Sequence, residues 1–81
     1  MKSEQLVTLY SPYYVFEDGF FKQQGEISRS FFILSGSWEK VEEIICDLLG
    51  GKYDAEEDRF ELQDQNLLFQ AMEKIAHYLA D

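Results

Sequence analysis

The chain holds few of the residues that are typical of secreted proteins. It has one cysteine, Cys46, so no disulfide can form within the chain. Its only asparagine, Asn66, is followed by two leucines and therefore lies outside an N-glycosylation motif. The first residues lack the apolar stretch of a signal peptide. Together these absences favour a reducing, cytoplasmic setting.

Long apolar runs and basic residues are also scarce. No run of roughly 18 apolar residues is present, so we expect no interaction with the interior of a membrane. Seven basic residues stand against 16 acidic ones, and the net charge of −9 argues against direct binding to nucleic acid. The hydrophobic content of 46% and the aromatic content of 16% are too high for a disordered chain. We therefore expect residues 1–81 to form a single domain.

The sequence offers no recognisable set of catalytic residues or metal ligands. Cys46 and His77 are alone of their types, and one of each cannot complete a zinc site. Nothing in the sequence brings them together as nucleophile and base. The acidic run at residues 54–58 matches a calcium-binding loop only in part, because Arg59 replaces the required glycine and Gln65 the final glutamate. We expect no enzymatic activity, no metal and no cofactor.

Residues 4–34 predict a sheet. They consist of short apolar runs separated by turn signals, which is typical of an antiparallel β-meander of three to four strands. Asp18-Gly19 between two apolar runs is a strong hairpin signal. Ser11-Pro12 and Gln24-Gly25 predict further interruptions, since proline cannot donate a hydrogen bond to a neighbouring strand.

The rest of the chain predicts a helix, a short hairpin and a second helix. Residues 37–49 have apolar side chains at helical spacing, with Ser37 as the N-cap residue. Residues 52–63 predict the hairpin, and residues 65–80 predict a C-terminal helix capped by Asp64. The expected fold class is α+β.

Three aromatic doublets fall within the predicted sheet, at residues 13–14, 20–21 and 31–32. Neighbouring residues on a strand point to opposite faces, so each doublet places rings on both faces of the sheet. If both helices pack on one face, the other face exposes aromatic surface and needs a partner. If one helix packs on each face, or a bulge interrupts a doublet, no partner is needed. We favour the first arrangement, with a protein-binding surface formed by Tyr13, Tyr14, Phe16, Phe20 and Phe21.

The acidic residues are concentrated in the middle of the chain. Residues 39–64 carry a net charge of −7, whereas residues 1–38 carry −1. Such a surface either stays solvated or attracts a basic partner and speeds its encounter with the chain. The residues that we expect to have this electrostatic role are Glu39, Glu43, Asp47, Glu56, Glu57 and Asp58.

The sequence therefore predicts a small acidic, non-enzymatic protein-binding module that acts as a regulator, inhibitor or accessory subunit. Its partner would be another protein, for instance one with a basic surface, or a second copy of the chain in a homodimer. The alternative is a nucleic-acid mimic, whose carboxylates occupy the basic groove of a DNA- or RNA-binding protein. Binding by a mimic should weaken steeply with added salt, whereas binding through aromatic rings should not.

Overall fold

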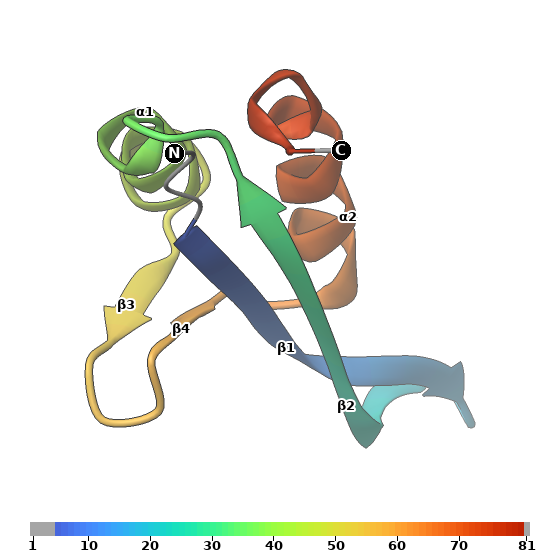
Figure 1. Ribbon diagram of the computed structural model, residues 1–81. Coiled ribbons are helices and arrows are strands. Elements are labelled where there is room, and N and C mark those ends of the chain that lie inside the picture. Colours follow the sequence, from blue (N-terminus) through green and yellow to red (C-terminus); the bar gives the residue numbers. More distant parts are fainter. Residues whose placement is uncertain (1–4, 81) are drawn as a thin grey trace.

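The structure is a computed structural model and describes residues 5–80. Figure 1 shows its elements, coloured along the chain. In chain order they are β1 (Gln5–Glu17), β2 (Phe20–Ile33), α1 (Trp38–Glu42), the π-helical segment η1 (Glu43–Leu48), β3 (Lys52–Asp54), β4 (Arg59–Glu61), α2 (Gln65–Lys74) and the 3₁₀ turn η2 (Ala76–Tyr78).

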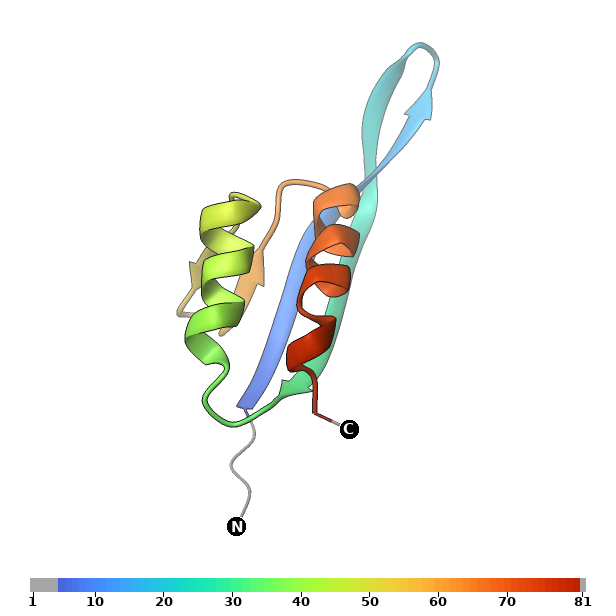
Figure 2. The same cartoon turned by 90° about the horizontal axis from the view of Figure 1, so that it is seen from above.

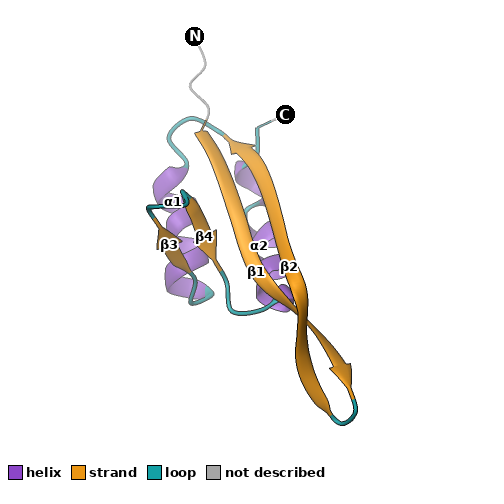
Figure 3. Cartoon of the chain, turned by 90° about the horizontal axis from the view of Figure 1, so that it is seen from below, coloured by secondary structure: helices purple, strands orange, loops and turns teal. Residues whose placement is uncertain are grey.

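The strands form one mixed sheet in the order β2-β1-β4-β3. The pairs β1–β2 and β3–β4 are antiparallel, whereas β1 and β4 are parallel. Both helices cover the same face of this sheet, as Figures 2 and 3 show from opposite sides. The predicted α+β class is confirmed, with a sheet followed by helix, short hairpin and helix. The short hairpin joins the first two strands in a four-stranded sheet.

The first two strands are longer than the sequence predicts. β1 continues through Ser11-Pro12 and β2 through Gln24-Gly25, so the turns predicted there are wrong. The last backbone hydrogen bond on this edge of β1 runs from the Leu62 amide to the Tyr10 carbonyl (2.8 Å). Pro12 faces the same edge two residues further along, beyond the end of β4. Proline is tolerated there because no neighbouring strand requires its missing N–H.

A β-bulge absorbs the second predicted interruption. Tyr13 pairs with Gly25 and Tyr14 pairs with Gln23, so Gln24 is an extra residue in β2. Such a bulge bends a strand and increases its twist without ending it. The predicted sheet began at residue 4, and that residue lies outside the described part of the chain.

The core lies between the two helices and the covered face of the sheet. Leu9 and Phe60 are paired on neighbouring strands and are fully buried. Trp38 and Tyr53 pack against Phe60, with ring centroids 5.4 and 5.0 Å away. The buried apolar residues are Val7, Leu9, Ile33, Val41, Ile45, Phe60, Leu62, Leu68, Ala71 and Ile75.

The observed ends of the helices agree only in part with those predicted from the sequence. Asp64 caps α2 as predicted, because its Oδ1 accepts a hydrogen bond from the Leu67 amide at 3.0 Å. Ser37 holds the N-cap position of α1, but its side chain makes no capping hydrogen bond. The second helix was predicted to reach residue 80, yet α2 ends at Lys74 and Leu79 is already extended.

The C-terminal residues leave the helix because they pair with the end of β2. Leu79 forms a bridge with Ile33. The Ala80 amide donates to the Phe32 carbonyl at 2.8 Å, and the Leu34 amide donates to the Tyr78 carbonyl at 2.8 Å. These hydrogen bonds satisfy backbone groups at the sheet edge that a continued helix would leave unpaired.

Candidate functional site

The distal part of the β1–β2 hairpin extends beyond both helices and beyond β3 and β4 (Figures 2 and 3). We call residues 13–25 the arm and the rest of the described chain the body. The arm makes the molecule elongated, with dimensions of 53 × 22 × 22 Å. Because no helix packs along it, the arm must be held by local interactions and by contacts at its base.

The tip of the arm is a two-residue turn. Asp18 and Gly19 both have positive φ angles, of 54° and 87°, as a type I′ turn requires. This turn matches the twist of the flanking strands, which explains why the sequence Asp-Gly closes the hairpin. The Lys22 Nζ lies 3.2 Å from Glu17 Oε1 and 3.6 Å from Asp18 Oδ2. These exposed ion pairs add little to stability.

The base of the arm is fastened to α2 by one amide side chain. The Nε2 of Gln65 donates to the Tyr14 carbonyl at 2.8 Å, and the Tyr14 amide donates to Gln65 Oε1 at 3.3 Å. Gln65 therefore pairs with Tyr14 much as a neighbouring strand would. Beside this contact is a shallow surface pocket lined by Tyr14, Phe21 and residues 63–66.

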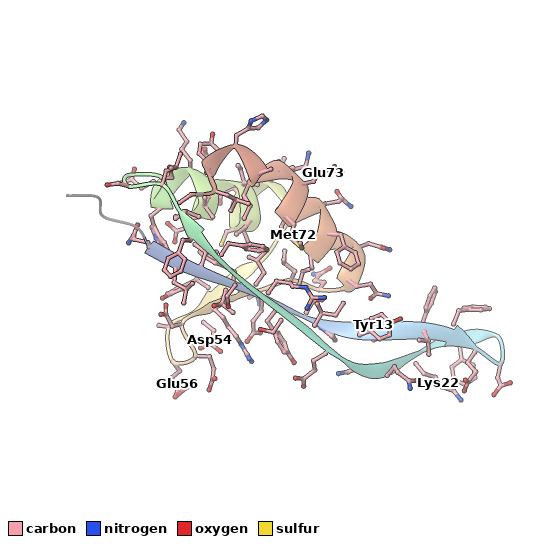
Figure 4. All side chains as sticks on the ribbon, turned by 45° about the vertical axis from the view of Figure 1, so that its right-hand side comes forward. Tyr13, Lys22, Asp54, Glu56, Met72 and Glu73 are labelled. Carbon is pink, nitrogen blue, oxygen red and sulfur yellow. The ribbon has the colours of Figure 1, made fainter. Side chains whose placement is uncertain are left out.

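All five aromatic residues that the sequence singles out lie on the arm. Tyr14 is half-buried, whereas the other four are exposed: Tyr13 by 38%, Phe16 by 66%, Phe20 by 55% and Phe21 by 69%. Phe16 and Phe21 are cross-strand neighbours, with ring centroids 5.1 Å apart and an edge-to-face angle of 70°. Figure 4 shows Tyr13 and Lys22 on the arm, away from both helices. The arm therefore presents apolar rings to solvent.

In the body, the uncovered face of the sheet is mostly polar. Tyr10 lies on this face, but the Arg59 guanidinium covers it, 3.9 Å from the ring centroid. Arg59 in turn lies 3.5 Å from a Glu61 carboxylate oxygen. The third doublet divides between the faces as expected, since Phe31 is half-buried against the core and Phe32 is exposed. Among residues 5–80, four exposed aromatic residues lie on the arm (Tyr13, Phe16, Phe20 and Phe21) and three lie on the body (Phe32, Tyr53 and Phe69).

The candidate acidic residues are exposed but lie away from the arm. Glu39, Glu43 and Asp47 line a shallow groove on the outer side of α1 and η1. The residues Glu56, Glu57 and Asp58 belong to the loop between β3 and β4. Figures 1 and 2 show α1, β3 and β4 on the side of the molecule opposite the arm. The aromatic and acidic residues therefore form two separate surfaces.

Two acidic side chains of the β3–β4 hairpin have structural partners. Asp54 Oδ1 accepts hydrogen bonds from the amides of Glu57 (3.3 Å) and Glu56 (3.0 Å), and these bonds lower the pKa of the Asp54 carboxyl. The Tyr53 hydroxyl donates to Asp58, which raises the pKa of Tyr53. Among residues 5–80, no three His, Cys, Asp or Glu side chains are placed to hold a metal ion. These contacts explain the shape of the loop.

In the described part of the chain, no hydrogen bond joins the single cysteine to the single histidine. Cys46 is half-buried on η1, and burial together with the charges of Glu42 and Asp47 raises the pKa of its thiol. A raised pKa disfavours the thiolate, which is the reactive form. His77 is exposed in η2.

Sequence reasoning missed the two side chains that shape the surroundings of the rings. Gln65 is a polar residue at the start of a helix, and only the bulged hairpin beside it gives it the role of fastening the arm. Arg59 covers Tyr10 because β1 and β4 are neighbours, and they are separated by some 50 residues in the chain. Neither contact leaves a local pattern in the sequence.

Comparison with known protein families, with curated proteins and with solved structures gives no significant match. Within residues 5–80, every helix is too short or too polar to cross a membrane. The geometry of the chain therefore carries the functional argument alone.

Proposed function

We propose that the chain is a small non-enzymatic protein-binding module that docks through its arm and acts as a regulator, inhibitor or accessory subunit. The observation that carries this proposal is the exposure of Phe16, Phe20 and Phe21 on a hairpin that lies outside the core. Contiguous exposed apolar surface is typical of interaction sites. Large aromatic side chains also dominate the binding energy of many interfaces.

The exposed rings are large enough to drive binding. Taking about 200 Å² for each aromatic side chain, the four exposed residues of the arm present about 450 Å². Removing that area from water would contribute on the order of 10 kcal/mol. The entropic cost of association is of similar size, about 4–15 kcal/mol. An arm that is already ordered by its turn and by Gln65 adds little to that cost.

The acidic surface supports a second part of the proposal. Residues 39–64 carry most of the net charge, and the elements that hold most of these residues, α1, η1, β3 and β4, lie away from the arm. We propose that Glu39, Glu43, Asp47, Glu56, Glu57 and Asp58 attract partners with a basic surface and raise the rate of encounter. The single cysteine is the reason to place the protein in the cytoplasm.

A nucleic-acid mimic is the second candidate function, and the acidic groove on α1 and η1 favours it. Glu39, Glu43 and Asp47 line this groove together with Glu42. In a mimic, these carboxylates would occupy the basic groove of a DNA- or RNA-binding protein, and the arm would make no essential contact. The two functions therefore depend on different residues.

The test is binding to proteins from the native host, measured by affinity capture with quantitative comparison of variants. The arm variant Phe16→Ala/Phe21→Ala should lose its captured protein at least tenfold relative to the unchanged chain. The matched control is Phe32→Ala, because Phe32 is 55% exposed but belongs to the body. Its capture should be unchanged.

A contrary result would be full capture by the arm variant. If, in addition, Glu39→Gln/Glu43→Gln/Asp47→Asn loses capture, and capture by the unchanged chain falls steeply between 50 and about 300 mM salt, the mimic is the better explanation. Capture that survives salt and is lost with the arm rings supports the arm as the docking surface.

A further inference from the structure

We propose that a second copy of this chain occupies the arm, paired through the outer edge of β2 so that Phe21 lies opposite Phe21 of the second copy. This inference rests on the proposed function, because it names the partner of the same arm. It follows from three features: the part of the sheet edge that is free, the registers that the charges allow, and the location of the net charge.

Part of the outer backbone of β1 and β2 is already covered. On β1, the Leu62 amide donates to the Tyr10 carbonyl, and Gln65 pairs with Tyr14. On β2, the Ala80 amide donates to the Phe32 carbonyl. Nearer the arm, the side chain of Arg29 donates to the Ser28 carbonyl at 2.9 Å. Both of these contacts on β2 lie in the body, so the arm part of β2 keeps its outer edge open.

The two-residue turn fixes which arm residues face outward. Glu17 and Phe20 flank this turn and bond to each other, so the backbone of the next pair, Phe16 and Phe21, points away from the hairpin. On β2, Phe21 and Gln23 then face the outer edge, before the bulge at Gln24. Within residues 5–80, β1 pairs with the inner edge of this stretch and no strand pairs with its outer edge. An unpaired edge of this kind is a template for an added strand.

Three symmetric antiparallel registers are compatible with these outward residues. With Lys22 opposite its own copy, two like charges face each other, which is destabilising. With Gln23 opposite its own copy, Lys22 faces the bulge residue Gln24, where regular pairing ends. With Phe21 opposite its own copy, Phe20 faces Lys22 of the second copy. Only this last register pairs an aromatic ring with a cation and avoids both conflicts.

The favoured register extends contacts that each chain already makes. On one face, the edge-to-face pair of Phe16 and Phe21 meets the same pair of the second copy and forms a row of four rings. On the other face, the Lys22 Nζ already lies 5.2 Å from the centroid of its own Phe20 ring. The same ammonium group is placed to contact Phe20 of the second copy.

The distribution of charge favours a second copy at the arm. Residues 13–25 carry a net charge of −1, whereas residues 39–64 carry −7. Antiparallel pairing of two arms puts the acidic bodies at opposite ends of the dimer. Each arm strand of five residues spans about 17 Å, so the two bodies lie farther apart than the screening length of about 8 Å in physiological salt.

The area of the rings predicts a weak dimer. The exposed aromatic surface of two arms amounts to about 900 Å² in total, which is below the lower limit of about 1,000 Å² for a specific interface even if all of it is buried. We therefore expect the dimer to dissociate at micromolar concentration and to form at higher concentration.

The first test is sedimentation equilibrium of the full chain from about 5 μM to about 1 mM, in 150 mM salt. The apparent mass should rise from monomer to dimer over this range. Phe21→Lys should weaken dimerisation at least tenfold, because it places two positive charges opposite each other. Phe32→Lys, the same substitution at an exposed ring of the body, should leave the dissociation constant within twofold of the unchanged chain.

The second test reports the register. In a Cys46→Ser background, Phe21→Cys should form a disulfide-linked dimer under mild oxidation much faster than Phe32→Cys. A chain that remains monomeric at 1 mM overturns the inference, as does a dimer that Phe21→Lys does not weaken. A dimer that Phe21→Lys weakens but Phe21→Cys does not cross-link overturns the register.

The experiments can contradict the dimer without contradicting the arm as a docking surface for another protein. If the chain stays monomeric but Phe16→Ala/Phe21→Ala abolishes capture of another protein, only the second copy is excluded and the arm remains a docking surface. If the arm variant changes neither the mass nor the capture, both proposals are wrong.

Discussion

The arm and the body are parts of the same two strands, yet different interactions hold them. In the body, Val7 and Leu9 of β1 are buried beneath the helices. In the arm, the type I′ turn and the side chain of Gln65 maintain a hairpin whose rings remain in solvent. A strand pair can thus supply both buried core residues and exposed rings simply by extending past the helices that cover it.

This comparison predicts that aromatic residues of the two regions differ most in their effect on stability. Phe60→Ala should lower the free energy of unfolding by about 3–5 kcal/mol, because it leaves a cavity beside Trp38 and Tyr53 in the core. Phe16→Ala removes an exposed ring and should change it by less than about 1 kcal/mol. Urea unfolding at low micromolar concentration, followed by circular dichroism, measures both. Equal losses would show that the arm belongs to the folded core.

Alanine substitutions at two glycines, one in the body and one in the arm, test the same comparison with smaller expected changes in stability. A Cβ at Gly51 would lie 2.8 Å from Ile45 Cγ2 and 3.1 Å from the Glu61 carbonyl oxygen, so Gly51→Ala should cost on the order of 1–3 kcal/mol. A Cβ at Gly25, in the arm, would meet nothing within 4 Å. Gly25→Ala should therefore change stability by less than about 0.5 kcal/mol. The same urea titration tests both variants, and a costly Gly25→Ala would mean that the bulge requires glycine.

The smallest expected effect is an alkaline loss of stability that originates in the body. The hydrogen bond to Asp58 raises the pKa of Tyr53 in the folded chain. The folded state therefore holds this proton more tightly than the unfolded state, so the contribution is present below about pH 10 and is lost as the pH rises through the raised pKa.

Thermal unfolding from pH 8 to pH 11.5 should show this difference between variants. Above pH 10, the unfolding midpoint of Tyr53→Phe should fall less than that of the unchanged chain. The control is Tyr13→Phe, which removes a tyrosine from the arm and leaves the bond between Tyr53 and Asp58 intact. If all three chains lose stability in parallel, the hydrogen bond has no measurable effect.

Much of the fold follows from local signals in the sequence. The Asp18-Gly19 turn, the Asp64 cap and the helix–hairpin–helix order need only neighbouring residues to be recognised. The continuity of β1 through Pro12 is different, because it depends on the absence of a strand beside Pro12. The parallel pairing of Leu9 with Phe60 is likewise invisible to any local pattern.

The same distinction applies to the candidate site. Two of the three aromatic doublets and Phe16 lie on the arm, whereas the third doublet, residues 31–32, lies on the body. The sequence predicts that the rings of the arm are exposed on an uncovered face of the sheet. In the structure they are exposed for a different reason, because the hairpin extends past the helices. It also did not predict that Arg59 covers Tyr10, so that the body presents a mostly polar face. Exposure depends on the relative lengths of elements, and these are set by tertiary contacts.

The pairing of β1 with β4 has a consequence for the order in which the chain folds. The β1–β2 hairpin closes between residues 17 and 20, a local event that takes about 1–10 μs. The contact between Leu9 and Phe60 must wait until about 50 intervening residues are available, and such distant pairings slow folding. During synthesis, the residues of the aromatic hairpin leave the ribosome before the acidic half of the chain, and β1 has no partner on its second edge until β4 has been made.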